Sequence, residues 1–163
     1  KNSYLALCIK NKEVIFNIKK YCEANKFDFK KIIFLDPIEH LENLKRISTF
    51  DIYLDTFPYN GHTGFSDSLF QSCVPSISLT GNSFASRVSY SLLKSLNLER
   101  LVTFNEKDYL KKIEYYCENQ EELLKIKKYL LEHKENNIHR MKKFTKNFEN
   151  LILNIFLKQK QEK

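Results

Sequence analysis

The sequence predicts an α/β protein built on an open, doubly wound parallel sheet. Short apolar runs that suit β-strands alternate along the chain with stretches whose apolar residues recur at helical spacing. These runs are apolar on both faces, which is typical of strands buried within a parallel sheet. Right-handed crossovers through the intervening helices then give an open sheet that is covered on both sides.

The order of the elements follows from the same patterns. Five short apolar runs are expected as strands: residues 4–9, 31–36, 51–55, 76–80 and 101–104. Seven stretches are expected as helices: residues 13–25, 40–48, 63–72, 83–96, a helix that begins at Glu106, 120–135 and 137–158. Asn105 stands directly before Glu106, where its side chain is suited to cap the helix.

The composition excludes several classes of protein. The chain has 163 residues, of which 42% are hydrophobic, with only three glycines and three prolines. Collagen-like and disordered chains need far more glycine and proline, or far fewer apolar residues. No apolar run approaches the roughly 18–20 residues that span a bilayer, so no membrane span is expected. The only methionine is Met141, which favours a piece of a longer protein.

The C-terminal segment carries most of the positive charge. The net charge is +7, and residues 139–163 hold seven Lys/Arg against two Glu. An apolar stripe runs through the same segment: Phe144, Phe148, Leu151, Ile152 and Ile155. We therefore expect residues 1–136 to form one lobe, with residues 137–163 as a basic amphipathic helix that packs on it. Contact with nucleic acid or an anionic membrane is the alternative, but no interleaved stacking aromatics support nucleic acid as a partner.

Four cysteines stand far apart in the sequence. They are Cys8, Cys22, Cys73 and Cys117. None forms a CxxC pair, and no nearby histidine completes a zinc pattern, so no metal site is expected. Unpaired thiols in apolar segments indicate a reducing compartment, and the sequence therefore predicts a cytoplasmic or nucleocytoplasmic protein.

Polar residues concentrate where the third expected strand ends. Asp55 ends this strand, a turn with Asn60 and Gly61 follows, and a helix begins near Thr63. Ligands of open parallel sheets bind beyond the carboxyl ends of the strands, and the free N–H groups of a helix start favour anions. The sequence therefore predicts an anion site at this turn.

The residues around this helix start have donor and acceptor groups that suit a nucleotide. Thr63 and Ser66 add hydroxyl donors, and His62 can donate from a ring nitrogen. Gly64 allows a phosphate to approach closely, and Asp67 can accept from a ribose hydroxyl. Each residue alone also has a structural interpretation, as a cap or a dipole partner, but their density favours a binding site. The turn is not a Walker loop, because no lysine follows its glycines.

A second polar concentration follows the fourth expected strand. Gly81 makes a turn there, Asn82 or Ser83 caps the next helix, and this helix bears Ser86 and Arg87. Arg87 could clamp an anion bidentately or hold the helix to the loop through a salt bridge. Both interpretations stay open from the sequence.

These residues resemble a known family. The resemblance is carried by LDTFPYNGHTGFSDSLF, VPSISLTGNSFASRVSYSLL and LERLVTFNEKDYL, which are similar to the C-terminal catalytic lobe of the O-linked N-acetylglucosamine transferases. It runs from about Asn2 to the C-terminal helices. The histidine of NGHT, His62, favours this branch over the related Spindly branch.

The resemblance implies the second half of a GT-B glycosyltransferase, with its first strand, an N-terminal lobe and tetratricopeptide repeats upstream of Lys1. It implies that His62, Thr63 and Gly64 cradle the donor pyrophosphate and that Asp67 contacts the ribose. The donor would be UDP-N-acetylglucosamine or another UDP-sugar, and the acceptor a Ser or Thr hydroxyl of a protein, attacked with inversion. No metal or other cofactor would take part.

The sequence departs from the family pattern at three places. The family's first strand, with its downstream phosphate-binding lysine, has no counterpart here and would lie before Lys1. The family usually reads NGHTT, so Gly64 removes one hydroxyl donor. The family also places a histidine near the uracil, where an ungapped count gives Asn43 and the nearby histidine is His40, and Arg46 matches the family's arginine near the base. These departures leave two alternatives open: a non-catalytic domain that binds a partner, and a sugar-nucleotide epimerase or hydrolase on the same scaffold.

Overall fold

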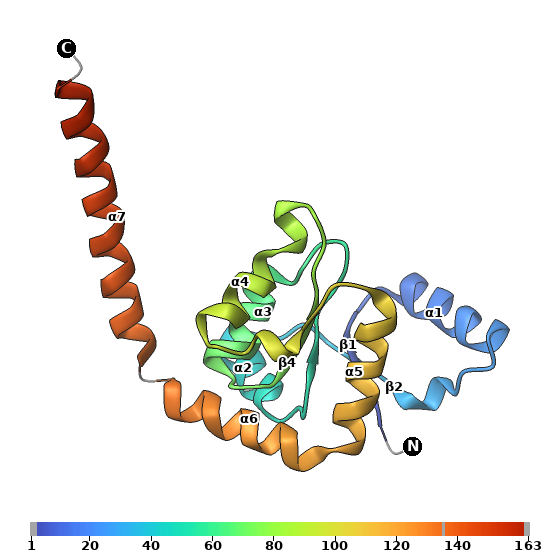
Figure 1. Ribbon diagram of the computed structural model, residues 1–163. Helices are drawn as coiled ribbons and strands as arrows, with labels where there is room; N and C mark the ends of the chain where they lie inside the picture. Colours follow the sequence, from blue (N-terminus) through green and yellow to red (C-terminus); the bar gives the residue numbers. More distant parts are fainter. Residues whose placement is uncertain (1–2, 135, 162–163) are drawn as a thin grey trace. The chain divides into compact units, whose positions relative to one another are not determined.

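The computed structural model describes residues 3–134 and 136–161 of the chain. The chain divides into two compact units, Lys1–Thr49 and Phe50–Lys163, and each is considered by itself. Every strand pair in both units is parallel, with helices between successive strands (Figure 1). This arrangement confirms the predicted α/β class.

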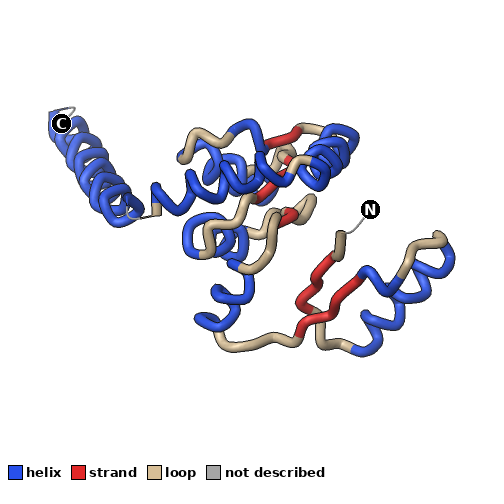
Figure 2. Tube along the Cα trace, turned by 90° about the horizontal axis from the view of Figure 1, so that it is seen from below, coloured by secondary structure: helices blue, strands red, loops and turns tan. Residues whose placement is uncertain are grey.

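The first unit contains two strands joined by a helix. Its elements are β1 (Leu5–Cys8), α1 (Lys12–Ala24), η1 (Phe29–Lys31), β2 (Ile32–Leu35) and α2 (His40–Ser48). β1 and β2 lie side by side in parallel, with Leu5 opposite Ile32 (Figure 2). The Asn11 side chain caps α1 by accepting from the Glu13 amide at 2.9 Å.

The second unit contains a three-stranded sheet in the order β3-β4-β5. Its first elements are β3 (Tyr53–Leu54), α3 (His62–Ser66), the π-helical turn η2 (Asp67–Gln71), β4 (Ser76–Leu79), η3 (Phe84–Ser86) and α4 (Val88–Ser95). The remaining elements are η4 (Glu99–Leu101), β5 (Val102–Thr103), α5 (Glu106–Glu118), α6 (Gln120–His133) and α7 (Asn136–Gln161). Asn105 caps α5, as expected, by accepting from the Asp108 amide.

The structure differs from the predicted elements in three details. The strands pair as two sheets, and β3 and β5 have only two residues each. The predicted helix 63–72 changes from α to π geometry at Asp67. The predicted helix 83–96 is split at Arg87, because a reciprocal Ser83–Ser86 capping box closes a separate 3-10 turn before α4.

The core of the second unit surrounds β4, in which every residue is buried. Fully buried side chains from the helices and connections pack around it: Phe65, Leu69, Leu93, Leu101 and Ile126. α3 packs against α4, and α5 packs against β4 (Figure 1). Because Phe65 and Leu69 belong to α3 and η2, the core fixes the turn that precedes them.

α7 is the predicted C-terminal helix. Its apolar stripe is exposed in the described chain, with Phe144 at 67% and Ile155 at 48%. Its packing on the lobe stays a prediction, and residues 162–163 of the predicted segment lie outside the described residues. Within the part of the chain that the structure describes, no helix is long and apolar enough to cross a membrane.

Candidate functional site

The Asp55 carboxylate organises the turn after β3. It is only 5% exposed, and its Oδ1 accepts from the amides of Gly61 at 2.7 Å and Thr56 at 3.0 Å. Its Oδ2 accepts from the Ser78 hydroxyl at 2.6 Å, which ties the turn to β4. The Tyr109 hydroxyl donates to the backbone carbonyl of Asp55 at 2.9 Å. The amide of Gly61, a residue of the predicted site, is therefore bound within the protein.

Asn60 stabilises the same turn through hydrogen bonds of its side chain and backbone. It is fully buried, and its Nδ2 donates to the carbonyls of Thr56 at 3.1 Å and Leu79 at 3.3 Å. Its backbone amide donates to the Ala85 carbonyl at 3.0 Å. Among the described residues, its Oδ1 has no hydrogen-bond partner. Asn60 thus joins the loops that follow β3 and β4.

His62 is held in an uncommon conformation. Its φ is 38°, in the left-handed region that residues other than glycine rarely adopt. Its ring stacks on Tyr59 with centroids 4.6 Å apart, meets the edge of Phe84 at 6.2 Å, and has Nε2 3.2 Å from the Ala85 carbonyl. Because Nε2 donates within the protein, donation to an anion would come from Nδ1 of the protonated ring. Such a strained residue is typical of a functional turn.

The amides after Gly61 are open. Among the described residues, the backbone N–H groups of His62, Thr63 and Gly64 have no acceptor, whereas the Phe65 amide donates to the Gly61 carbonyl at 3.3 Å. Thr63 is exposed, and Ser66 and Asp67 are half-buried. Three successive donors at the first turn of a helix present positive potential to an anion. The structure thus places open amides at the start of α3, and the anion site predicted there stays a prediction.

Tyr53 also belongs to this site, although the sequence analysis did not single it out. A Cβ added to Gly61 would lie 3.1 Å from the Tyr53 hydroxyl, and one added to Gly64 would lie 3.2 Å from it. Burial, with the charges of Asp55 and Asp67, raises the pKa of Tyr53. The signal was available, because residues two apart in a strand point to the same face, as Tyr53 and Asp55 do.

The loop after β4 is a structural support for this turn. Ser86 is buried and forms the capping box with Ser83, at 3.2 Å from the Ser86 amide to the Ser83 hydroxyl. The Gly81 amide donates to the Ser86 carbonyl at 3.0 Å. Arg87 is exposed, and no ion pair with it is found among the described residues. The described residues thus give no support to the salt-bridge interpretation of Arg87, and its anion-clamp interpretation stays a prediction.

Replacing Gly81 with alanine is expected to lower the free energy of unfolding by about 1–3 kcal/mol. The new Cβ would lie 2.6 Å from the Ser86 hydroxyl and 3.0 Å from Phe57 Cε2, and Ser86 is held by its capping box. Gly64→Ala is the control, because its Cβ meets only the far end of the Tyr53 side chain. Urea unfolding checks both variants, and equal losses would contradict the steric argument.

α2 brings the predicted base-binding residues of the first unit onto one face, since His40, Asn43 and Arg46 are three residues apart. Arg46 donates from Nη1 to the Asp36 carbonyl at 2.8 Å and from Nη2 to Asn43 Oδ1 at 2.6 Å. Asn43 therefore orients Arg46 at the end of β2. Their predicted roles near the base stay predictions.

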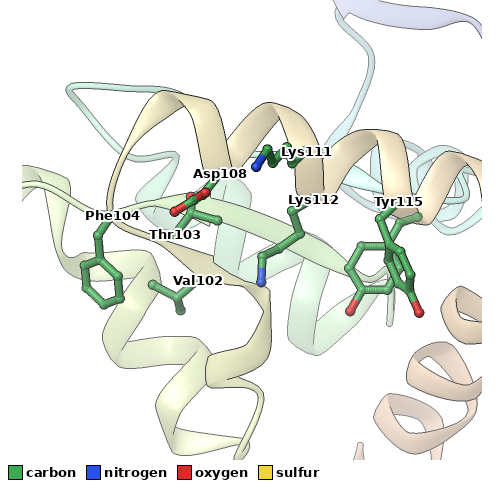
Figure 3. A pocket seen from close by; sticks show the side chains of 8 residues that line it. Val102, Thr103, Phe104, Asp108, Lys111, Lys112 and Tyr115 are labelled. Carbon is green, nitrogen blue, oxygen red and sulfur yellow. The ribbon is translucent and has the colours of Figure 1, made fainter.

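The structure also contains a pocket that the sequence analysis missed. It has a volume of about 440 Å³ and lies between β5 and α5 (Figure 3). Its lining includes Thr103, Asp108, Lys111, Lys112 and Tyr115. Lys112 donates to the Arg100 carbonyl, and burial lowers the pKa of its ammonium group. None of the predicted site residues lines this pocket.

Neither metal ligation nor disulfide formation is seen in the described part of the chain. Across residues 3–134 and 136–161, no group of three or more His, Cys, Asp or Glu side chains is placed to hold a metal ion. The four cysteines are unpaired. The reducing compartment stays a prediction.

The second unit is thus an α/β lobe with a parallel sheet and a turn with open backbone amides beyond the end of β3. The chain belongs to glycosyl transferase family 41, whose family model matches residues 2–148. It is also similar in structure to a mutant of the O-GlcNAc transferase of Thermobaculum terrenum, with a TM-score of 0.77 and 22% identity. That match covers 82% of this chain and 26% of the other, and it shows the fold of a GT-B lobe.

Curated relatives come from both branches of the family. The chain is 38% identical over 88 residues to the probable UDP-N-acetylglucosamine--peptide N-acetylglucosaminyltransferase SPINDLY of Solanum lycopersicum, which covers 54% of this chain and 9% of that protein. It is 33% identical over 94 residues to the UDP-N-acetylglucosamine--peptide N-acetylglucosaminyltransferase of Caenorhabditis elegans, covering 58% of this chain and 8% of that protein. The chain thus spans about a tenth of the length of these relatives.

Proposed function

We propose that this chain is the donor-binding lobe of a protein O-GlcNAc transferase that uses UDP-N-acetylglucosamine. The proposal is supported by membership of glycosyl transferase family 41 and by relatives named for transfer of N-acetylglucosamine to peptides. The observation that carries it is the turn at residues 61–64, where three backbone amides have no acceptor among the described residues.

In this proposal, the amides of His62, Thr63 and Gly64 bind the diphosphate of the donor. Asp55 holds the turn rigid through the Gly61 amide, so the donors are arranged before the ligand arrives. Fixed N–H dipoles stabilise the negative charge that develops on UDP as it leaves, without a metal ion. Asp67, one turn further along, accepts from a ribose hydroxyl.

The reaction itself needs an acceptor. A Ser or Thr hydroxyl of a protein attacks the anomeric carbon of the sugar with inversion, the bond to UDP breaks, and the hydroxyl proton passes to a base. We assign no residue of this chain as that base. The lobe therefore contributes donor binding and leaving-group stabilisation, and the longer protein of which it is a part supplies the acceptor site.

Titration of the chain with UDP, followed by amide NMR, tests the proposal. We expect chemical shift changes centred on residues 61–67, larger with UDP than with inorganic phosphate. The replacement His62→Ala is expected to weaken UDP binding about tenfold, because it releases the strained turn and removes the ring.

His133→Ala is the matched control. The His133 ring also packs against a tyrosine: its centroid lies 4.0 Å from that of Tyr129, with the rings tilted by 31°, and its Nδ1 lies 2.8 Å from the Tyr129 carbonyl oxygen. Its loss should leave UDP affinity unchanged. Equal shifts with phosphate and UDP, or no shifts at residues 61–67, would rule out the proposal. In a separate incubation with UDP-N-acetylglucosamine and no acceptor, release of free sugar or of an epimer would favour the hydrolase or epimerase alternative.

A further inference from the structure

The Tyr53 hydroxyl lies close to the two glycines of the turn at residues 61–64. Gly61 and Gly64 are three residues apart and both face it, since a Cβ on either would come within 3.2 Å of its oxygen. Asp67 continues the same helical face three residues further and contributes to the electrostatic environment of Tyr53. The hydroxyl thus stands where a side chain at position 64 would otherwise project.

The phenol is placed to donate a hydrogen bond to a ligand. Among the described residues, no hydrogen bond of its hydroxyl is found, although Tyr53 is half-buried. Its ring is fixed by edge-to-face packing on the buried Phe65, at 5.9 Å and 84°. Burial and the neighbouring carboxylates raise the pKa of Tyr53, so the hydroxyl stays protonated near neutral pH. A protonated, oriented and unpaired hydroxyl is a ready donor to an anion.

The nearby Asp55 carboxylate already accepts hydrogen bonds from other groups. The Asp55 carboxylate is bound by the Gly61 and Thr56 amides and the Ser78 hydroxyl. The hydroxyl lies 3.2 Å from the Cβ position of Gly64, whose own backbone amide is one of the open donors. A hydroxyl donor close to an open amide suits an anion with several oxygens better than a single neutral group.

We propose that the Tyr53 hydroxyl, which fills the space left by the missing side chain of Gly64, donates a hydrogen bond to the diphosphate of the nucleotide donor. This inference rests on the proposed function and adds a binding residue to it. It also changes the meaning of Gly64. From the sequence, this glycine was expected to remove a hydroxyl donor from the phosphate site. In the structure, it makes room for the hydroxyl of Tyr53, a residue of β3.

Tyr53→Phe removes only the hydroxyl and keeps the ring on Phe65. In isothermal titration of the chain, we expect UDP affinity to fall about tenfold, as for the loss of one hydrogen bond to a charged group. Uridine, which lacks the diphosphate, should bind the variant and the unchanged chain equally. Tyr129→Phe is the matched control, because Tyr129 is also half-buried and its hydroxyl donates to the Leu96 carbonyl at 2.9 Å and not to any residue of the turn. It should leave UDP affinity unchanged.

A rescue experiment separates a binding role from a structural one. Adding Gly64→Thr to Tyr53→Phe returns a hydroxyl to the same space, so UDP affinity should recover most of the tenfold loss. Gly64→Thr alone places its side chain against the Tyr53 hydroxyl and should not improve binding.

Three results would overturn the inference. If the unchanged chain binds UDP and Tyr53→Phe binds it equally well, Tyr53 has no binding role and the proposed function stands. If uridine binding falls as much as UDP binding, the hydroxyl contacts the nucleoside and not the diphosphate. If the unchanged chain does not bind UDP, the proposed function and the role of Tyr53 both fail.

Discussion

Replacing Phe65 with alanine is expected to lower the free energy of unfolding by about 3–5 kcal/mol. The Phe65 side chain is fully buried in the core of the second unit and meets Tyr53 edge to face. Truncation leaves a cavity beneath α3 that the surrounding close-packed side chains fill only in part. Because natural domains are stable by only about 5–15 kcal/mol, this single change removes a large share of the stability.

The same replacement should also abolish UDP binding. Phe65 follows directly on the open amides of residues 62–64, and its own amide bonds to the Gly61 carbonyl. A helix that loses its buried anchor no longer holds these amides in place. Urea unfolding monitored by circular dichroism measures the loss of stability.

Phe84→Ala is the matched control for this experiment. Phe84 is the same residue type, on a loop beside the same site, but it is 77% exposed. Its truncation should change the free energy of unfolding by less than about 0.5 kcal/mol, as for most surface replacements. Similar losses for the two variants would contradict the description of the core.

Asp55→Ala is expected to cost about 3 kcal/mol and to disorder the turn. The change leaves the Gly61 amide and the Ser78 hydroxyl without their shared acceptor, both in a buried setting. Each buried donor without a partner costs about 1–3 kcal/mol. Thermal unfolding gives the stability change, and amide hydrogen exchange at Gly61 reports directly on the broken bond.

Asp55→Asn tests whether geometry or charge matters at this position. The asparagine oxygen can still accept from the Gly61 amide, and its NH₂ group can donate to Ser78, because a hydroxyl can rotate to become the acceptor. We therefore expect a loss of only about 1 kcal/mol for this variant. A loss as large as that of Asp55→Ala would show that the negative charge itself holds the turn.

Much of the fold and part of the site follow from local patterns in the sequence. The alternation of strands and helices, the Asn105 cap and the position of the turn were predicted from residue spacing alone. These features depend on residues within a few positions of one another, so hydrophobic periodicity and turn chemistry encode them directly. Membership of the family also followed from short blocks of the chain.

The chemistry inside the turn could not be read in the same way. The sequence placed Gly61 in the ligand-binding turn, but the structure shows that its amide donates to Asp55. It offered His62 as a ring donor, but Nε2 of that ring already donates to the Ala85 carbonyl. It counted Gly64 as a lost hydroxyl, and Tyr53 fills that space. In each case the partner lies between six and 23 residues away in the sequence.

The sequence by itself determined the class of the fold and the family, and it predicted the turn at which we propose that a ligand binds. Only the tertiary structure decided which donors at that place are used by the protein and which stay open. The physical reason is that a hydrogen bond depends on distances and angles of a few tenths of an ångström. Such precision arises when the core packs Phe65 and Ile77 and fixes α3 and β4, and residue spacing does not record it.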